Sequence, residues 1–156
     1  VAAHTPQAHV VLAELSEEAL KVCRQNIRRC GLSGRVVSVR ADAASKPVSM
    51  GEFRCIVCNP PYIPTADLDT LDVSVRDYEP RMALDGGPDG YRFYRLISEL
   101  WRQALAPGGR LYFEVGVGQA GEVLRIMRAP GLWGHQIGPG TAGHSRVVYG
   151  TLCTEI

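Results

Sequence analysis

The residues best suited to chemistry are Asn59-Pro60-Pro61-Tyr62, which directly follow the apolar run Phe53–Cys58, a predicted buried strand. The two prolines fix the backbone and remove two N–H donors, so the carbonyls of Asn59 and Pro60 are predicted to point outward, unused by any β-ladder. The Asn59 side chain adds a further acceptor, and Tyr62 adds a flat aromatic face. Such a set is suited to holding a planar –NH2 group, with one acceptor for each hydrogen and a wall against its plane.

Fixed acceptors matter because an amide or exocyclic nitrogen is a poor nucleophile, with its lone pair delocalised. Hydrogen bonds from both hydrogens favour positive charge on the nitrogen and aim its lone pair at an electrophile. The electrophile expected here is the methyl group of a sulfonium. The alternative interpretation of the segment is an ordinary proline-rich turn after a strand.

Two carboxylates follow earlier apolar runs in the same way. Glu14 ends the run HVVLAE, and Asp42 follows the β-branched run RVVSVR. An acid at a strand end accepts hydrogen bonds from ribose hydroxyls in nucleotide-binding sheets. The alternatives are a solvated acid before a helix for Glu14 and an N-cap or turn acid for Asp42. Together with Asn59, the two acids indicate a site for a nucleoside-like cofactor.

The elements that must position these residues alternate along the chain. Apolar residues at helical spacing follow the predicted N-cap Ser16 and stop at Gly31, while β-branched runs mark strands. We expect helices over 17–30, 91–105 and 119–127, and strands over 9–14, 35–40, 53–58, 110–117, 133–137 and 146–152. The segment 59–90, rich in Pro, Asp and Gly, is predicted to be a long functional loop.

This order predicts an α/β fold with a mostly parallel sheet and an antiparallel C-terminal edge pair. A length of 156 residues, with 46% hydrophobic and 21% charged residues, fits one globular domain. The net charge of +1 argues against direct binding of nucleic acid or a membrane surface. No apolar run approaches the ~18 residues of a membrane span, so we expect a cytoplasmic protein.

The five cysteines include Cys55 and Cys58, at the C-x-x-C spacing of metal and redox sites. Residues three apart on a strand point to opposite faces, and no second pair or nearby histidine completes a zinc site. We therefore expect no metal site and interpret the cysteines as buried thiols.

Several segments together resemble the Rossmann-like S-adenosylmethionine-dependent methyltransferases, specifically the glutamine-N5 methyltransferases of peptide-chain release factors. The resemblance covers essentially the whole chain and is carried by VVLAELSEEAL, RADAA, CNPPYIP and PGGRLYFEVGVGQ. NPPY alone is shared with adenine-N6 methyltransferases. The pattern EP-x-x-AL-x-GG-x-DG-x-x-x-Y, from Glu79 to Tyr94, is more particular to the glutamine enzymes.

For the cofactor, the resemblance implies S-adenosylmethionine, with S-adenosylhomocysteine as product and no metal. Glu14 would hold the ribose hydroxyls, Asp42 and Ala43 would border the adenine, and Asn59 would touch both cofactor and substrate. Ala43 replaces what is often a larger side chain in the family.

For the substrate, the resemblance implies a glutamine in the GGQ motif of a release factor, and hence protein methylation in translation termination. The substrate-binding residues would be Asn59, Pro60, Pro61 and Tyr62. Of these, Asn59, Pro60 and Tyr62 would be catalytic: the Asn59 side chain and the Pro60 carbonyl accept the two amide hydrogens, and Tyr62 packs on the amide plane.

Two family features are absent: the Gly-rich turn after the first strand and the N-terminal helical domain. We therefore expect residues 1–156 to be an N-terminally incomplete catalytic domain, with a break in mid-sheet or a strand supplied from outside. The alternative functions are adenine-N6 methylation of DNA or RNA, and a catalytically incomplete fragment. Arg76 and Arg81 are candidates to meet the substrate backbone, and Glu114 either lines the cofactor side or is a paired buried acid.

Overall fold

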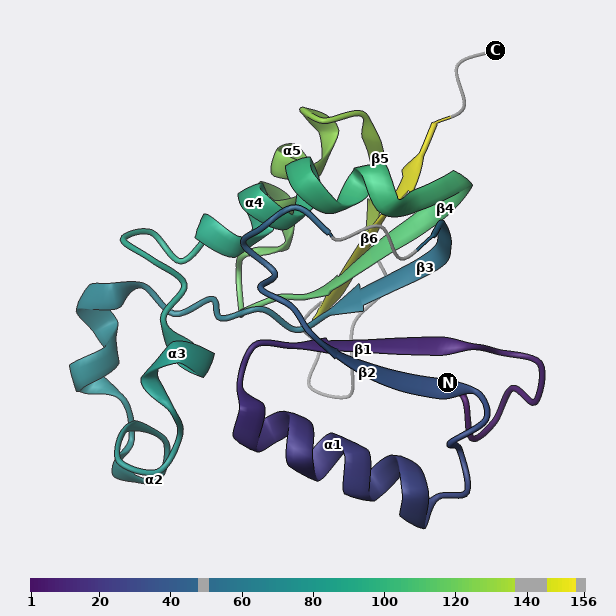
Figure 1. Cartoon of the computed structure of the whole chain (residues 1–156). Coiled ribbons are helices and arrows are strands. Elements are labelled where there is room, and N and C mark those ends of the chain that lie inside the picture. The colour runs from purple at the N-terminus through teal and green to yellow at the C-terminus, as the bar shows by residue number, and fades with distance from the viewer. Residues whose placement is uncertain (48–50, 137–145, 154–156) are drawn as a thin grey trace. The chain divides into compact units, whose positions relative to one another are not determined.

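The structure is a computed structural model that describes residues 1–47, 51–136 and 146–153, without the side chains of 134–136. The chain divides into two compact units, Val1–Val48 and Ser49–Ile156 (Figure 1). They are called unit 1 and unit 2 below, and each is described by itself.

Unit 1 is a β-α-β unit. Strand β1 (Val10–Glu14) pairs in parallel with β2 (Val36–Arg40), and helix α1 (Glu17–Arg29) connects them. The Ser16 hydroxyl accepts the backbone N–H of Ala19 (3.3 Å), which caps the helix as predicted. Gly31, with a φ of 65°, follows the helix end, where a left-handed conformation favours glycine.

Unit 2 contains a four-stranded sheet in the order β3-β4-β6-β5. Its strands are β3 (Phe53–Cys58), β4 (Leu105–Glu114), β5 (Leu132–Gln136) and β6 (Val147–Leu152). The β3–β4 pair is parallel, whereas β4–β6 and β5–β6 are antiparallel. The predicted α/β class with an antiparallel C-terminal pair is therefore confirmed.

The described strands form two separate sheets, β1–β2 in unit 1 and β3-β4-β6-β5 in unit 2. The prediction that β3 is buried is wrong: Arg54, Cys55 and Val57 are exposed. The reason is that β3 lies at the edge of the unit 2 sheet, while the helices α4 (Arg92–Trp101) and α5 (Ala120–Arg128) pack on β4, β5 and β6.

Helix α4 differs from its prediction in both length and buried face. It ends at Trp101, and a 3-10 turn, η2 (Arg102–Ala104), leads directly into β4. We expect Phe93, Leu96, Ile97 and Leu100 on the core side, but the buried residues are Tyr94, Ile97, Ser98 and Trp101. The helix is rotated because Tyr94 packs edge-on against Phe113 of β4, with the ring centroids 5.1 Å apart.

Strand β4 also begins earlier than predicted and ends earlier. It starts at Leu105, which pairs with Phe53, and the Pro107-Gly108-Gly109 turn is absorbed as an irregularity before Cys55 pairs with Arg110. The strand ends at Glu114, so 115–117 lie beyond it.

The segment 59–90 is not a plain loop. It contains three short helical turns, η1 (Thr65–Thr70), α2 (Val73–Arg76) and α3 (Arg81–Leu84). Asp72 caps α2 by accepting the backbone N–H of Ser74 (2.8 Å). Turns of four to six residues leave too little periodicity to be visible in the sequence. We call 65–84 the arm. No described helix of either unit has the length and apolar character needed to cross a membrane.

Helix α4 offers a direct test of this core. Ile97→Ala should lower the free energy of unfolding by ~2–5 kcal/mol, because Ile97 is only 2% exposed and its removal leaves a cavity. The exposed Glu99, two residues away, is the control, and Glu99→Ala should change it by less than ~0.5 kcal/mol. Urea denaturation followed by circular dichroism measures both. Equal effects would contradict the assigned buried face.

Candidate active site

Unit 1 places two predicted cofactor ligands at the same end of its parallel strand pair. Glu14 is the last residue of β1 and pairs with Arg40, and Asp42 follows two residues later. The Glu14 Oε1 accepts the backbone N–H of Ser16 (2.7 Å), and the Asp42 Oδ1 accepts that of Ala44 (2.8 Å). These bonds orient both carboxylates at the carboxyl ends of the strands. Ala43 lies half-buried in the turn that Asp42 begins.

Unit 2 places the NPPY segment (59–62) just past the carboxyl end of β3. The β3–β4 register ends with Cys58 opposite Phe113, so Asn59 and Pro60 lie beyond the last registered pair. The Asn59 side chain is exposed, whereas Pro60 is buried.

Three glycines leave the space that Tyr62 occupies. A Cβ on Gly86 would lie 2.7 Å from the Tyr62 Cα, and one on Gly90 would lie 2.5 Å from the Tyr62 carbonyl oxygen. A Cβ on Gly116 would lie 3.1 Å from the Tyr62 Cδ2. Any side chain at the first two positions would displace the Tyr62 backbone. The GG-x-DG pattern is thus a packing surface for the NPPY segment.

The two ends of the arm are clamped together beside Tyr62. Ile63 donates its N–H to the Leu84 carbonyl (3.1 Å) and accepts the N–H of Gly86 (2.8 Å). The Thr65 hydroxyl donates to the Asp85 Oδ1 (2.7 Å). This bond and the N–H of Gly87 lower the pKa of Asp85, so its carboxylate stays charged and keeps both contacts.

The Tyr62 hydroxyl is bonded by Arg146, the residue just before β6. Arg146 donates from one Nη2 to the Tyr62 hydroxyl oxygen (3.4 Å) and to the Glu114 Oε1 (3.2 Å). Glu114 is therefore a partly exposed, ion-paired acid rather than a buried one. The sequence analysis did not identify Arg146 as a site residue, because only the fold brings the start of β6 beside NPPY.

Tyr94 and Gln119 complete the network and were also missed from sequence. The Tyr94 side chain is fully buried, and its hydroxyl donates to the Glu114 carbonyl (3.0 Å). Burial raises the pKa of Tyr94, so the hydroxyl remains a donor at neutral pH. Gln119 donates from Nε2 to the Tyr62 carbonyl (3.1 Å). Their signals were the last residue of the Glu79–Tyr94 pattern and the glutamine of VGVGQ.

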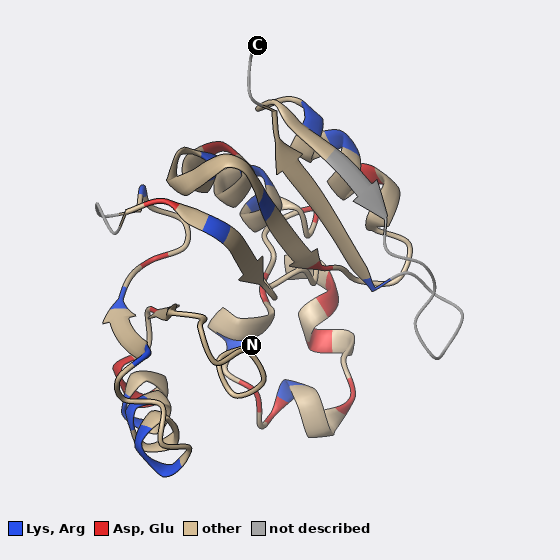
Figure 2. Cartoon of the chain, turned by 90° about the vertical axis from the view of Figure 1, so that its right-hand side faces the viewer, with Lys and Arg blue, Asp and Glu red and all other residues tan. Residues whose placement is uncertain are grey.

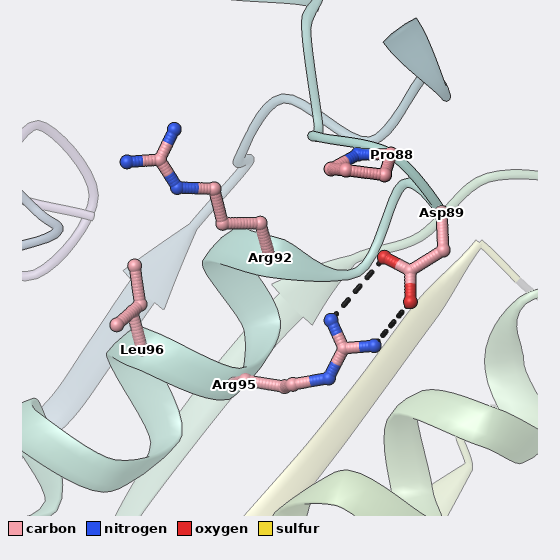
Figure 3. A pocket seen from close by; sticks show the side chains of 5 residues that line it. All are labelled: Pro88, Asp89, Arg92, Arg95 and Leu96. Atoms are coloured by element: carbon pink, nitrogen blue, oxygen red, sulfur yellow. Dashed lines mark hydrogen bonds and ion pairs between the residues drawn. The ribbon is translucent and has the colours of Figure 1, made fainter. Parts of the chain in front are cut away.

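A pocket opens next to this region, at the start of α4 (Figure 3). It is lined by Pro88, Asp89, Arg92, Arg95 and Leu96. Asp89 pairs with Arg95 and also accepts the Tyr91 N–H (3.1 Å), which fixes the turn into the helix. In Figure 3 the Arg92 guanidinium points away from this pair. Asp89, the aspartate of the DG in the pattern, thus stabilises the turn that leads into α4.

Positions of Lys and Arg and positions of Asp and Glu are both spread along the described chain (Figure 2). In the arm, Arg76 pairs with Asp77 (2.8 Å) and Arg81 lies 3.8 Å from Asp69, all of them exposed. The two arginines proposed to meet a substrate backbone therefore have acidic partners within the arm.

The C-x-x-C pair forms no metal site within the described residues, where no group of three or more metal-binding side chains occurs. The expectation of buried thiols is wrong for Cys30, Cys55 and Cys153, which are exposed. Cys23 and Cys58 are half-buried, and burial raises the pKa of the Cys58 thiol, directly before Asn59, to about 12.

The close approach at Gly90 gives a matched prediction. Gly90→Ala and Gly108→Ala both place a side chain at positive φ (77° and 72°), which costs each ~1–2 kcal/mol of stability. Only Gly90→Ala meets an obstacle, the Tyr62 carbonyl, whereas Gly108 faces open space. We expect Gly90→Ala to cost a further ~1–3 kcal/mol in urea denaturation. Equal losses would argue against the contact.

The raised pKa of the Cys58 thiol predicts slow alkylation. At pH 8 its raised pKa keeps it protonated, so iodoacetamide should alkylate Cys30 and Cys153 but leave Cys58 largely unmodified. Labelling of Cys58 should increase as the pH approaches 12 or when urea unfolds the protein. Mass spectrometry of peptides locates the label, and rapid labelling of Cys58 at pH 8 would contradict the structure.

Comparison with known proteins gives relatives over nearly the whole chain. A family model described as "Methyltransferase small domain" matches residues 1–74. The "Release factor glutamine methyltransferase" of Geobacter sulfurreducens is 41% identical over 152 residues, covering 97% of this chain and 52% of the relative. That of Moorella thermoacetica is 40% identical over 147 residues, covering 94% and 51%.

Solved structures agree on the fold. A methyltransferase from Pyrococcus furiosus aligns with a TM-score of 0.69 over 98% of this chain and 67% of its own, at 17% identity. The chain spans about half the length of the curated relatives that it matches. It has the Rossmann-like methyltransferase fold, and over nearly its whole length it is similar to release factor glutamine methyltransferases.

Proposed function

We propose that the protein containing this chain transfers a methyl group from S-adenosylmethionine to the side-chain amide nitrogen of a glutamine in a peptide-chain release factor. The observation that carries the proposal is the NPPY segment, which lies past the end of β3 and is anchored at Tyr62. The names of the relatives support the release factor as substrate.

The substrate amide would be held by three residues of this segment. The exposed Asn59 side chain accepts one amide hydrogen through its Oδ1, and the Pro60 carbonyl accepts the other. Tyr62 packs on the amide plane, and Pro61 keeps the backbone between them rigid. Two fixed acceptors favour positive charge on the nitrogen and direct its lone pair, which raises its nucleophilicity.

The carboxylates of unit 1 suit the cofactor by their chemistry. Glu14, whose other oxygen has no partner among the described residues, would accept the ribose hydroxyls, and Asp42 with Ala43 would border the adenine. Asn59 would contact the cofactor as well as the substrate. Bound there, S-adenosylmethionine supplies an electrophilic methyl group on a sulfonium sulfur and leaves as S-adenosylhomocysteine.

Residues 1–156 would form part of the methyltransferase catalytic domain, with further residues completing it. That the described strands form two separate sheets supports this, since a parallel sheet of this class is normally continuous. The shared length of about half of each relative agrees.

The test is methyl transfer from labelled S-adenosylmethionine by the full-length protein, offered a release factor and an adenine-containing DNA duplex side by side. We expect label on the release factor glutamine and a loss of at least ~100-fold with Asn59→Ala, because one of two fixed acceptors is removed. Asn26→Ala, at an exposed asparagine of α1, is the control and should leave the rate unchanged.

Label on the duplex would replace the proposal by adenine-N6 methylation. Label on neither substrate would point to a catalytically incomplete protein.

A further inference from the structure

The side-chain amide of Gln119 joins separate segments of unit 2. Its Oε1 accepts the backbone N–H of Gly116 (3.0 Å), just past β4, and its Nε2 donates to the backbone carbonyl of Tyr62 (3.1 Å). The Tyr94 hydroxyl of α4 lies 3.5 Å from the same Oε1. Because one backbone neighbour is a donor and the other an acceptor, a single orientation of the amide satisfies both.

The slot that holds this amide depends on the absence of two side chains. A Cβ on Gly116 would lie 2.7 Å from the Gln119 Oε1, and one on Gly90 would lie 3.1 Å from its Nε2. The Gly90 position is also the one that would meet the Tyr62 carbonyl. The Gln119 amide and the Tyr62 carbonyl are therefore packed against Gly90, and the amide is also packed against Gly116.

The NPPY segment needs an anchor of this kind. Pro60 and Pro61 have no N–H, so they cannot donate to a neighbouring strand. The first backbone group after the prolines with a bond outside the segment is the Tyr62 carbonyl, and Gln119 supplies its donor. Ile63 follows with its two bonds to Leu84 and Gly86. Gln119 thus bonds the last residue of the segment, two residues after the proposed acceptor Pro60.

We propose that Gln119 is a positioning residue of the methyl transfer: its amide holds the Tyr62 carbonyl and thereby sets the orientation of the NPPY acceptors. The inference rests on the proposed function for its kinetic consequence. Gln119 makes no contact with the substrate amide in this role, so its loss should lower kcat and leave the KM for S-adenosylmethionine unchanged.

The variant Gln119→Glu isolates the donor. A protonated carboxyl has one O–H donor and one carbonyl acceptor, the same pattern as the amide, whereas a carboxylate has acceptors only. Contact with the Tyr62 carbonyl favours the protonated form and raises the pKa of the introduced carboxyl above its usual ~4.3. The donor is therefore present at low pH and lost as the pH rises through that pKa.

Among the described residues, Gln119 bonds to Tyr62 in the NPPY loop and to Tyr94 on α4. The titratable groups around these two tyrosines are Glu114 on β4, Arg146 before β6 and Cys58 on β3, and all of them are the same in wild type. Dividing the kcat of the variant by that of wild type at each pH removes their contribution.

With a release factor as substrate, we expect Gln119→Glu to have a kcat about tenfold below wild type at pH 8 and to recover to within about twofold near pH 5. Gln119→Ala, which lacks the donor at every pH, should stay low throughout. Gln103→Glu, at an exposed glutamine of η2, is the charge-matched control and should follow wild type. Thermal unfolding checks that each variant is folded.

A wild-type kcat for Gln119→Glu at pH 8, or a deficit without recovery in acid, would overturn the positioning role. Hydrogen exchange of peptides covering 59–64 gives a reading without substrate: relative to wild type, exchange should be faster in Gln119→Glu at pH 8 but not near pH 5. If wild type itself methylates no release factor, the proposed function fails, and the exchange ratio still tests the anchor.

Discussion

The absence of side chains at Gly86, Gly90 and Gly116 is the constraint on which the candidate site depends. Gly86 and Gly90 let the backbone of Tyr62 approach to distances that no Cβ would permit, and Gly116 leaves room for its ring. Close approach in turn brings the Tyr62 carbonyl within reach of Gln119 and lets the Ile63 backbone clamp the arm. The NPPY segment is rigid because of what surrounds it as well as because of its own prolines.

This rigidity matters for the proposed chemistry. An amide nitrogen gains nucleophilicity only if both hydrogens meet acceptors that do not move with it. Acceptors on a loop are usually less fixed than acceptors on a strand, and here the loop is bonded at Tyr62 to Gln119, just before α5, and to Arg146, just before β6. The two ends of the arm are joined by the bonds of Ile63 and Thr65.

In the proposed function, unit 1 supplies residues for the cofactor and unit 2 supplies residues for the substrate amide. Unit 1 presents carboxylates at the ends of β1 and β2, suited to hydroxyl groups of a nucleoside, and unit 2 presents neutral acceptors and an aromatic ring, suited to a planar amide. Both sets follow the carboxyl ends of parallel strands, where side chains are free of the ladder.

The sequence alone determined the bounds of β3, those of β1 to within one residue, the cap and stop of α1, and the similarity to the methyltransferases, because each depends on local propensity or on a contiguous motif. It did not determine the buried face of α4, which follows from the packing of Tyr94 on Phe113, nor the short helices of the arm. Gln119 and Arg146 lie 57 and 84 residues from Tyr62, and only tertiary structure brings them to it, since no local pattern encodes a contact over that separation.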